Sequence, residues 1–369
     1  MTQTQTPMPT EPRTAIDPDR LQQLVEQAVG DFGSVLNATL VVVGDRLGLY
    51  RAIAAVGSVT SAELAEYTGT AERNVREWLA AQSAAGYVTW DGRDATGANR
   101  FSLSPEQREA LTNDTSPAFL CGGFQVVTAA AKADEKLTEA FHTGAGVGWH
   151  EHHHDLFEGT ERFFRPGYAA SLVSSWLPAL TGVMDKLQRG ASVADVGCGH
   201  GASTVLMASA FPNSHFTGFD YHAPSIDSAR TAAAGAGVAS RTTFEVSPAS
   251  TFGGNGYDLV CYFDCLHDMG DPVGALRHTR EALRDDGTVM LVEPAAGDAL
   301  EDNLNPVGRL FYAASSLICT PASQSQEVGR ALGAQAGVAQ LTAVANEAGF
   351  MNVRLAERTP FNIVLELRP

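Results

Sequence analysis

The stretch that decides the fold is VADVGCGHGAST, Val193 to Thr204. An apolar run leads into Gly197, Gly199 and Gly201, and a segment of helical character follows. Glycines between a strand and a helix allow a tight turn, and they let the backbone approach a ligand without an intervening Cβ. The same letters also satisfy the relaxed dinucleotide fingerprint, with Ala202 at its last position, so the loop alone does not decide between ligands.

Short apolar runs alternate with helical segments over residues 189–369. This alternation is typical of a doubly wound parallel sheet. We therefore predict an α/β, Rossmann-like domain whose last two strands are close enough in sequence to form an antiparallel hairpin. The predicted strands are 192–196, 215–220, 243–246, 257–263, 288–293, 352–356 and 361–367.

Three segments precede this domain. Residues 1–17 are polar and proline-rich and predict a disordered tail, and residues 116–188 predict a helical, aromatic linker. Residues 18–115 contain two apolar helices, a helix-turn-helix and two alternating strands, which together form the winged-helix pattern. In that segment the predicted strands are 87–90 and 100–103, and the predicted breaks between the first two helices are Gly33, Gly44 and Gly48.

The charge balance argues against nucleic acid as a partner. The chain carries a formal net charge of -17, and the segment from Asp19 to Asp114 has eight arginines, no lysine and thirteen acidic residues. A DNA reader usually shows a basic surface, and an acidic chain repels phosphate backbones and anionic membranes. We expect the winged helix to pack or to dimerise rather than to read DNA.

The sequence favours a cytoplasmic protein. Its five cysteines are scattered and contain no C-x-x-C pair, which fits a reducing compartment. The N-terminus lacks the apolar core of a signal peptide. The longest apolar run, near Ala38 to Val43, is far shorter than the roughly 20 residues that cross a bilayer, so no membrane segment is expected.

The combination of motifs resembles class I S-adenosylmethionine-dependent methyltransferases. The glycine loop reads D-x-G-x-G-x-G, it follows a helical cap, and the sheet ends in the predicted hairpin. The winged helix narrows the resemblance to two-domain bacterial methyltransferases of the actinobacterial regulator-like type, which are similar to small-molecule O-methyltransferases. In those relatives the N-terminal domain mainly dimerises, so the resemblance implies a homodimer. The residues that carry it are 195–201, 219–221, 263–268, Glu293-Pro294 and 348–367.

The resemblance also implies a set of cofactor contacts. The three loop glycines, Gly197, Gly199 and Gly201, match the loop that accepts the methionine part of S-adenosylmethionine, and Asp195 would contact that end. Asp220 would bind both ribose hydroxyls, because a carboxylate can accept two hydrogen bonds. Many relatives place an acidic residue near the adenine after the third strand, but this chain has none there. The remaining expected contacts are Tyr221 on the adenine, backbone near Ala249 or the hydroxyls of Ser247 or Ser250, and Phe263 and Asp264.

A histidine is the expected catalytic base. O-methyltransferases of plants and bacteria carry it in an L-H-D-W-x-D segment after the fourth strand, and Leu266 to Asp271 reads L-H-D-M-G-D. His267 matches that base and would remove the acceptor proton, a task that suits imidazole near neutral pH. Glu293, at the end of the fifth strand, would orient the ring. The alternative is that His267 only caps the following helix.

A second motif, GVGWHEHHHDLFEG at residues 146–159, satisfies the H-E-x-x-H pattern of zinc proteases. The flanking glycines predict a poor helix, and no third ligand follows at the usual spacing, so we predict no metal site. The resemblance instead implies a lid over the substrate pocket, with a solvated loop as the alternative. The expected pocket residues are Trp149, His150, Phe164 and Tyr168.

We therefore predict methyl transfer from S-adenosylmethionine to a small-molecule acceptor, most plainly at oxygen. Two alternatives stay open at this point. One is a cofactor-binding transcriptional regulator whose winged helix reads DNA. The other is an inactive relative that holds the cofactor only as a structural element.

Overall fold

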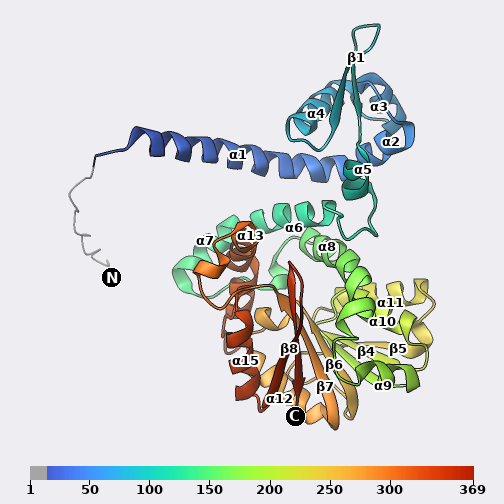
Figure 1. Ribbon diagram of the computed structural model, residues 1–369, viewed down its shortest axis with the longest axis vertical. Coiled ribbons are helices and arrows are strands. Elements are labelled where there is room, and N and C mark those ends of the chain that lie inside the picture. Colours follow the sequence, from blue (N-terminus) through green and yellow to red (C-terminus); the bar gives the residue numbers. More distant parts are fainter. Residues whose placement is uncertain (1–14) are drawn as a thin grey trace.

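The computed structural model describes residues 15–369, so most of the expected tail lies outside the described part. The first unit is helical with a two-stranded wing, in which β1 and β2 pair antiparallel (Figure 1). Its wing strands lie close to the predicted positions. The elements are α1 (Pro18–Arg46), α2 (Leu49–Val56), α3 (Ser61–Thr68), α4 (Glu72–Ala84), β1 (Thr89–Arg93), β2 (Asn99–Ser102) and α5 (Pro105–Thr112).

The predicted helix breaks at Gly33 and Gly44 are wrong, because α1 runs through both. The break falls at Gly48, which has a φ of 68° that favours glycine. Gly44 has a different use. A Cβ there would lie 2.4 Å from Trp78 Cζ2, so the missing side chain lets α1 approach α4 closely.

The two arginines of α4 are held by glutamates of the same helix. Arg73 pairs with Glu77, and Arg76 pairs with Glu72, each at an N–O distance of 2.5 Å. In a winged helix that reads DNA, the second helix of the helix-turn-helix would present such arginines to the phosphates of the DNA. These arginines are already engaged by acidic partners.

A helical connector joins the winged helix to the sheet domain. Its helices approach closely: a Cβ on Gly122 would lie 2.7 Å from the backbone of Arg162, and one on Gly159 would lie 2.9 Å from Val126 N. The elements are α6 (Cys121–Ala131), α7 (Asp134–Thr143), the 3₁₀ turn η1 (Trp149–Glu151), α8 (Asp155–Ser171), the π-helical turn η2 (Leu172–Trp176) and α9 (Val183–Arg189).

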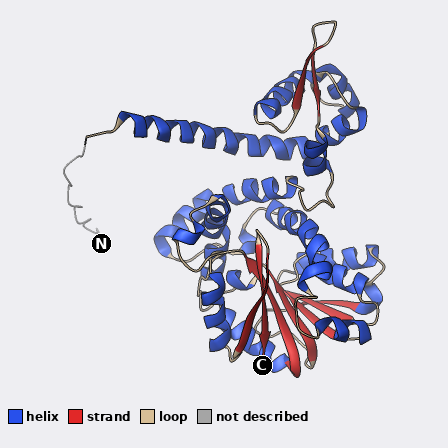
Figure 2. Ribbon diagram, viewed as in Figure 1, coloured by secondary structure: helices blue, strands red, loops and turns tan. Residues whose placement is uncertain are grey.

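The last unit is a seven-stranded sheet with helices on both faces (Figure 2). The strand order is β5-β4-β3-β6-β7-β9-β8, in which β9 runs antiparallel to both β7 and β8. The predicted fold class, including the terminal hairpin, is confirmed. The strands are β3 (Ser192–Val196), β4 (His215–Asp220), β5 (Thr242–Val246), β6 (Tyr257–Phe263), β7 (Leu283–Pro294), β8 (Asn352–Arg358) and β9 (Asn362–Arg368).

The helices and short turns of this unit connect the strands and cover the sheet. The α-helices are α10 (Ala202–Ala210), α11 (Ala223–Gly235), α12 (Pro272–Ala282), α13 (Pro306–Ala314), α14 (Thr320–Gln324) and α15 (Gly337–Glu347). The turns are η3 (Ala239–Arg241), η4 (Leu266–Asp268), η5 (Glu301–Asn303) and η6 (Ser315–Cys319).

The central strands are buried on both faces, as the continuous apolar runs predict. In β6, Leu259 and Cys261 pack into a core with α8, α10 and α11, whereas Val260 and Tyr262 pack into a second core with α12 and α15. The chain leaves β3 toward β4 and β5, and later returns to place β6 on the other side of β3. The strand order reverses there, and doubly wound folds bind ligands at the carboxyl ends of strands at such a point.

Helix α1 differs from the rest of the described chain in its exposure. Phe32 is 67% exposed and Leu36 is 72% exposed, and the N-terminal half of the helix extends beyond the winged-helix elements (Figure 1). Of the helices described, it alone is long and apolar enough to cross a membrane by length and composition. Core helices of soluble proteins and signal sequences meet the same two criteria.

Candidate active site

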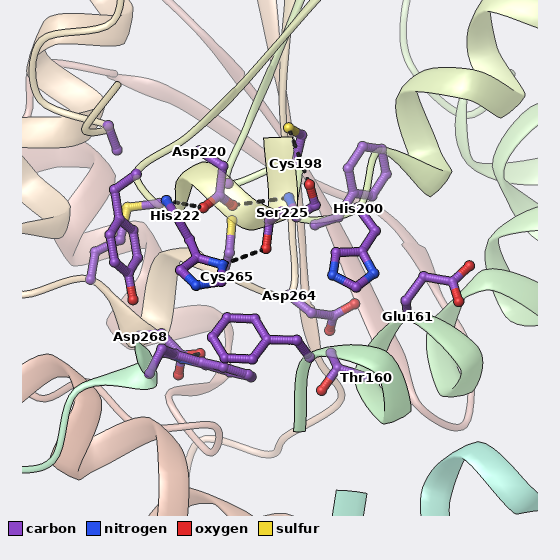
Figure 3. Close-up of a pocket in the computed structure, with 18 of the residues that line it drawn as sticks. Thr160, Glu161, Cys198, His200, Asp220, His222, Ser225, Asp264, Cys265 and Asp268 are labelled. Carbon is purple, nitrogen blue, oxygen red and sulfur yellow. Dashed lines mark hydrogen bonds between the residues drawn. The ribbon is translucent and has the colours of Figure 1, made fainter. Parts of the chain in front are cut away.

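A cavity of about 370 Å³ opens at the carboxyl ends of β3, β4 and β6 (Figure 3). One side is the glycine loop with the segments that follow β4 and β5. The other side is formed by η1 and α8 of the connector. The cavity therefore joins the expected cofactor residues to the expected lid.

The three loop glycines have different tasks, although all have positive φ. A Cβ on Gly197 would lie 2.8 Å from Cys265 Sγ, and one on Gly201 would lie 2.8 Å from Ala229 Cβ. Within the described residues, nothing lies within 4 Å of a Cβ built on Gly199. Gly197 and Gly201 thus allow close packing, and Gly199 leaves open space on the cavity side.

Asp195 precedes the glycine loop and holds the start of the helix that follows it. It is 1% exposed, and its Oδ2 accepts hydrogen bonds of 2.6 Å from both Ser203 Oγ and Thr204 Oγ1 at the start of α10. Its Oδ1 has no hydrogen-bond partner among the described residues. Burial raises the pKa of this carboxyl to about 6, against the lowering effect of the two hydroxyls. Asp195 does not line the cavity, so it braces the loop in this structure.

Asp220 lies at the end of β4 and lines the cavity. Its Oδ2 accepts from Gly199 N at 2.9 Å, and its Oδ1 accepts from His222 N at 2.8 Å. Each oxygen keeps a further lone pair, so the carboxylate fits two ribose hydroxyls. Burial raises its pKa above the usual range. Tyr221 and Ala249 line the same region, as expected, together with Ser247.

Asp264 follows β6 in a left-handed conformation with a φ of 50°, which is uncommon for a residue other than glycine. Tyr168 Oη donates to its Oδ2 at 2.9 Å, and Asn362 Nδ2 donates to its Oδ1 at 2.8 Å. Burial, with a further contribution from the Glu293 charge, raises its pKa to about 7. Both Asp264 and Phe263 line the cavity.

The connector supplies the aromatic wall. All four expected pocket residues line the cavity: Trp149, His150, Phe164 and Tyr168. Phe157 of α8 stacks on His222 at a ring-centroid distance of 4.3 Å, which joins the lid to the segment after β4. An apolar wall with a few polar groups is the usual composition of a small-molecule pocket.

The expected base and its orienting carboxylate are together but lie behind the cavity wall. His267 is 3% exposed, its Nδ1 pairs with Glu293 Oε2, and Glu293 Oε1 accepts from Leu266 N at 3.0 Å. His267 is not among the residues that line the cavity, whereas the next residue, Asp268, is.

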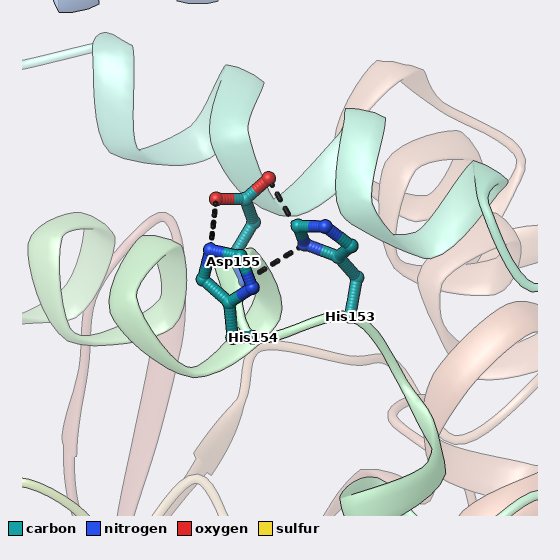
Figure 4. Close-up of side chains that lie close together, drawn as sticks. All are labelled: His153, His154 and Asp155. Carbon is teal, nitrogen blue, oxygen red and sulfur yellow. Dashed lines mark hydrogen bonds and ion pairs between the residues drawn. The ribbon is translucent and has the colours of Figure 1, made fainter.

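The histidine cluster separates into different environments. Residues 149–151 form a 3₁₀ turn and α8 begins only at Asp155, so the two histidines of H-E-x-x-H do not share one helix. His150 lines the cavity, and His152 is buried without a hydrogen-bond partner in the described residues. His153 and His154 lie beside Asp155 (Figure 4), and neither lines the cavity.

Several wall residues were not expected from the sequence. Ser325 and Gln326 belong to a segment without a recognisable motif, and Gln326 Nε2 donates to the backbone oxygen of Asp268 at 2.8 Å. Thr160 and Glu161 could have been found from their place one helical turn before Phe164. Further lining residues that the sequence did not predict are His222, Asp268 and Met269.

Comparisons with known proteins agree with this geometry. Residues 194–289 match the family model of a methyltransferase domain, and residues 36–113 match an Rv2258c-like winged HTH domain. No curated protein matches the chain. The resemblance predicted from the motifs is therefore confirmed for both domains, and a methyltransferase domain implies S-adenosylmethionine as the methyl donor.

Solved structures share the fold over nearly the whole chain. Mitomycin 7-O-methyltransferase MmcR is 21% identical with a TM-score of 0.68, covering 95% of this chain and 100% of its own. Human N-acetylserotonin methyltransferase, in complex with S-adenosylmethionine, is 16% identical with a TM-score of 0.66, covering 96% and 99%. The neocarzinostatin O-methyltransferase NcsB1, in complex with S-adenosylhomocysteine and 1,4-dihydroxy-2-naphthoic acid, is 20% identical with a TM-score of 0.57, covering 90% and 95%. The chain thus joins a methyltransferase domain to an N-terminal Rv2258c-like winged helix-turn-helix domain.

Proposed function

We propose that this protein transfers a methyl group from S-adenosylmethionine to a hydroxyl oxygen of a small, flat, largely apolar molecule. The observation that carries the proposal is the single cavity in which Gly199 and Asp220 face Trp149, Phe164 and Tyr168. A donor held on the first side and an acceptor held on the second would meet within it. Bringing the two reactants together in line is the main contribution of such an enzyme.

The residues fit the donor. Gly199 leaves the space, Asp220 is free to accept from two ribose hydroxyls, and Tyr221 lies where it could cover an adenine. S-adenosylmethionine supplies a methyl group on a positively charged sulfur. Asp220 and Asp264 face the cavity, and neither forms an ion pair with a lysine or arginine among residues 15–369. Their negative charge favours a cationic donor.

The acceptor side supports an aromatic substrate. Phe164 and Tyr168 stack at a centroid distance of 5.7 Å, and Trp149 packs edge-to-face on Phe157. The NcsB1 complex holds a dihydroxynaphthoic acid, which is a flat molecule with hydroxyl groups. We propose that a related class of phenol fits between α8 and Met269 of this chain. The proton of its hydroxyl would leave through the carboxylates and histidine that follow β6.

Calorimetry with S-adenosylmethionine tests the donor. We expect one site per chain and a loss of at least tenfold in affinity for Asp220→Asn, with the exposed Asp285→Asn as the matched control. Tritiated S-adenosylmethionine with a panel of phenols and naphthols then tests transfer. Binding without transfer to any hydroxyl would contradict the proposed reaction, and no binding would contradict the proposed cofactor.

We also propose a cytoplasmic homodimer formed through α1. Its exposed apolar residues lie at helical spacing, and a groove of about 400 Å³ between α1 and α4 is lined by Leu40, Val43 and Trp78. All five cysteines are free, as in a reducing compartment. Phe32→Glu should shift the protein from dimer to monomer in analytical ultracentrifugation, with Glu26→Gln as the control. A wild-type monomer would contradict the proposed dimer. A gel shift at low salt is a separate test, and it would detect DNA binding, which is the alternative function.

A further inference from the structure

The lid residue Trp149 is hydrogen-bonded to the turn that carries the expected base. Its Nε1 donates to Asp268 Oδ2 at 2.9 Å, and Asp268 lines the cavity, as Trp149 does (Figure 3). The preceding residue, His267, is 3% exposed and does not line the cavity. An acceptor in the cavity therefore cannot contact His267 until part of this wall moves.

The turn η4 is the fixed side of this wall. Gln326 Nε2 donates to the backbone oxygen of Asp268 at 2.8 Å, and Gln326 Oε1 accepts from Gly270 N at 3.0 Å. Ser323 Oγ donates to the backbone oxygen of Met269 at 2.8 Å. Side chains of one neighbouring segment thus hold the backbone of three successive residues. We expect this side to stay in place when the other side moves.

The lid segment 146–152, which carries Trp149, is tied to its surroundings at fewer points. Val147 N donates to Pro321 O at 3.0 Å, and the half-exposed Lys136 reaches one backbone oxygen of the segment at 2.7 Å. The other hydrogen bonds of this segment run within it, apart from that of Trp149. Segments with few bonds to the rest of a protein are those that open locally.

A buried histidine makes the closed position of this segment less stable. His152 is 7% exposed, and neither of its ring nitrogens has a hydrogen-bond partner in the part of the chain that the structure describes. Burying a polar group without a partner is unfavourable. Movement of the segment away from η4 would return water to the ring, so His152 favours opening.

Two glycines before η1 show what the closed position requires. Gly144 and Gly146 share a φ of 73°, which suits glycine at both places. A Cβ on Gly146 would lie 2.2 Å from Pro321 O, whereas no described atom lies within 4 Å of a Cβ on Gly144. An added methyl group therefore strains the backbone equally at both positions, but it obstructs the closed lid only at Gly146.

We propose that the lid segment 146–152 is a gate between the cavity and His267, and that the structure shows this gate closed. In the open position Trp149 leaves Asp268 and its edge-to-face contact with Phe157, and an acceptor hydroxyl can then reach His267. The inference rests on the proposed function for the reason that an acceptor has to reach this histidine. The movement itself needs neither donor nor acceptor.

Exchange of the imidazole C2 hydrogen of His267, followed by mass spectrometry of the ligand-free protein, tests the gate. We expect exchange to be about fivefold or more faster in Gly146→Ala than in Gly144→Ala, because the new Cβ disfavours the closed lid. Rates measured from pH 6 to pH 9 separate a change in exposure from a change in the pKa of His267. Equal rates in the two variants would overturn the proposal, whether or not the protein binds S-adenosylmethionine or methylates a phenol.

Two further variants distinguish a gate from general loosening of the fold. Trp149→Phe keeps an aromatic ring and removes only the Nε1 donor, so exchange at His267 should be about threefold faster than in Trp90→Phe, which alters an exposed tryptophan of the wing. His152→Leu removes the unpartnered nitrogens and should slow the exchange below that of the wild type. Faster exchange in His152→Leu would overturn the gate and assign the exchange to unfolding.

Discussion

Two groups of carboxylates in this chain differ in how their charge is balanced. Asp155 is 2% exposed at the start of α8, and the chain itself neutralises it with Arg46 of α1 and with Lys132, which directly follows α6, at 2.5 and 2.7 Å. The cavity carboxylates Asp220 and Asp264 have hydrogen-bond donors but no lysine or arginine within ion-pair distance in the described residues. The charge of Asp155 is therefore neutralised within the protein, whereas the charges of Asp220 and Asp264 remain available to a bound cation.

The pKa shifts have opposite directions in the two groups. Burial raises the pKa of Asp155, but hydrogen bonds from Lys132 and Arg46 outweigh it, so the carboxyl ionises more readily than usual. For Asp264, burial and the Glu293 charge raise the pKa to about 7, with too little compensation from Tyr168. Ionised Asp155 therefore stabilises the fold, whereas ionised Asp264 costs stability until a cation arrives. The difference separates a structural link from a binding site.

The largest expected effect is on stability, from Asp155→Asn. It leaves Arg46 and Lys132 without their shared partner, and we expect the free energy of unfolding to fall by about 2 kcal/mol at pH 7. Breaking a buried pair costs about 3–5 kcal/mol, but both cations here are about half exposed and regain water. Chemical denaturation checks this value, with exposed Asp134→Asn as the control. An unchanged free energy of unfolding would show that Asp155 does not stabilise the fold.

The same link predicts a pH dependence. The folded-state pKa of Asp155 lies below the value near 3.9 of an unfolded chain, so its contribution is full above that value and is lost as the pH falls through the folded-state pKa. The wild type should therefore lose its advantage over Asp155→Asn in acid. An advantage at pH 2 that is as large as the advantage at pH 7 would contradict the assignment.

The next effect is on donor binding, from Asp264→Asn. Asparagine suits the left-handed backbone and keeps one hydrogen bond, while the negative charge is lost. We expect S-adenosylmethionine affinity to fall about tenfold at pH 8, or about 1.4 kcal/mol. The stability of the ligand-free protein at that pH should not fall, because an ionised Asp264 opposes folding there. Calorimetry and thermal denaturation on the same samples give both values.

The pH dependence of binding sharpens this prediction. A cationic donor favours the ionised carboxyl, so wild-type affinity should rise as the pH increases through about 7, with proton release on binding below that value. Asp264→Asn should flatten the rise. A rise of equal size in the variant would assign the cationic contact to Asp220 instead.

Regular elements were the part of the molecule that could be predicted from the sequence. The strands of the parallel sheet are buried on both faces, so each appears as an apolar run, and the bounds of β3, β4 and β6 match the prediction. The sequence pattern did not show that α1 continues through Gly33 and Gly44. At Gly44 the helix packs against Trp78 of α4, a contact that no local pattern in the sequence shows. No described residue lies within 4 Å of a Cβ built on Gly33.

The site was partly predictable for a similar reason. The expected residues of the glycine loop and of β4 lie together because strand ends meet at one edge of a sheet. Which of His267 and Asp268 faces the cavity depends on the turn η4 and on Gln326, a residue 58 positions beyond Asp268 in the chain. No spacing rule connects those positions, so the arrangement of these two side chains could be seen only in the structure.

The smallest expected effect concerns the histidine cluster, from His153→Ala combined with His154→Ala. Both rings lie within ion-pair distance of Asp155, at 3.1 and 3.5 Å, but Lys132 and Arg46 already neutralise it. Burial, with the Lys132 charge, lowers the pKa of His153, so this ring is mostly neutral at pH 7 and gains little from the carboxylate. We expect the free energy of unfolding to change by less than about 0.5 kcal/mol, as for exposed pairs.

Zinc gives the matching test of the same cluster. A metal ion at His153, His154 and Asp155 would have to displace Arg46 or Lys132 from the carboxylate, so added zinc should leave the melting temperature of the wild type unchanged. A rise in melting temperature that the double variant abolishes would show that the cluster binds metal. Asp155 would then resemble the cavity carboxylates, because its negative charge would be neutralised by a ligand from outside the chain.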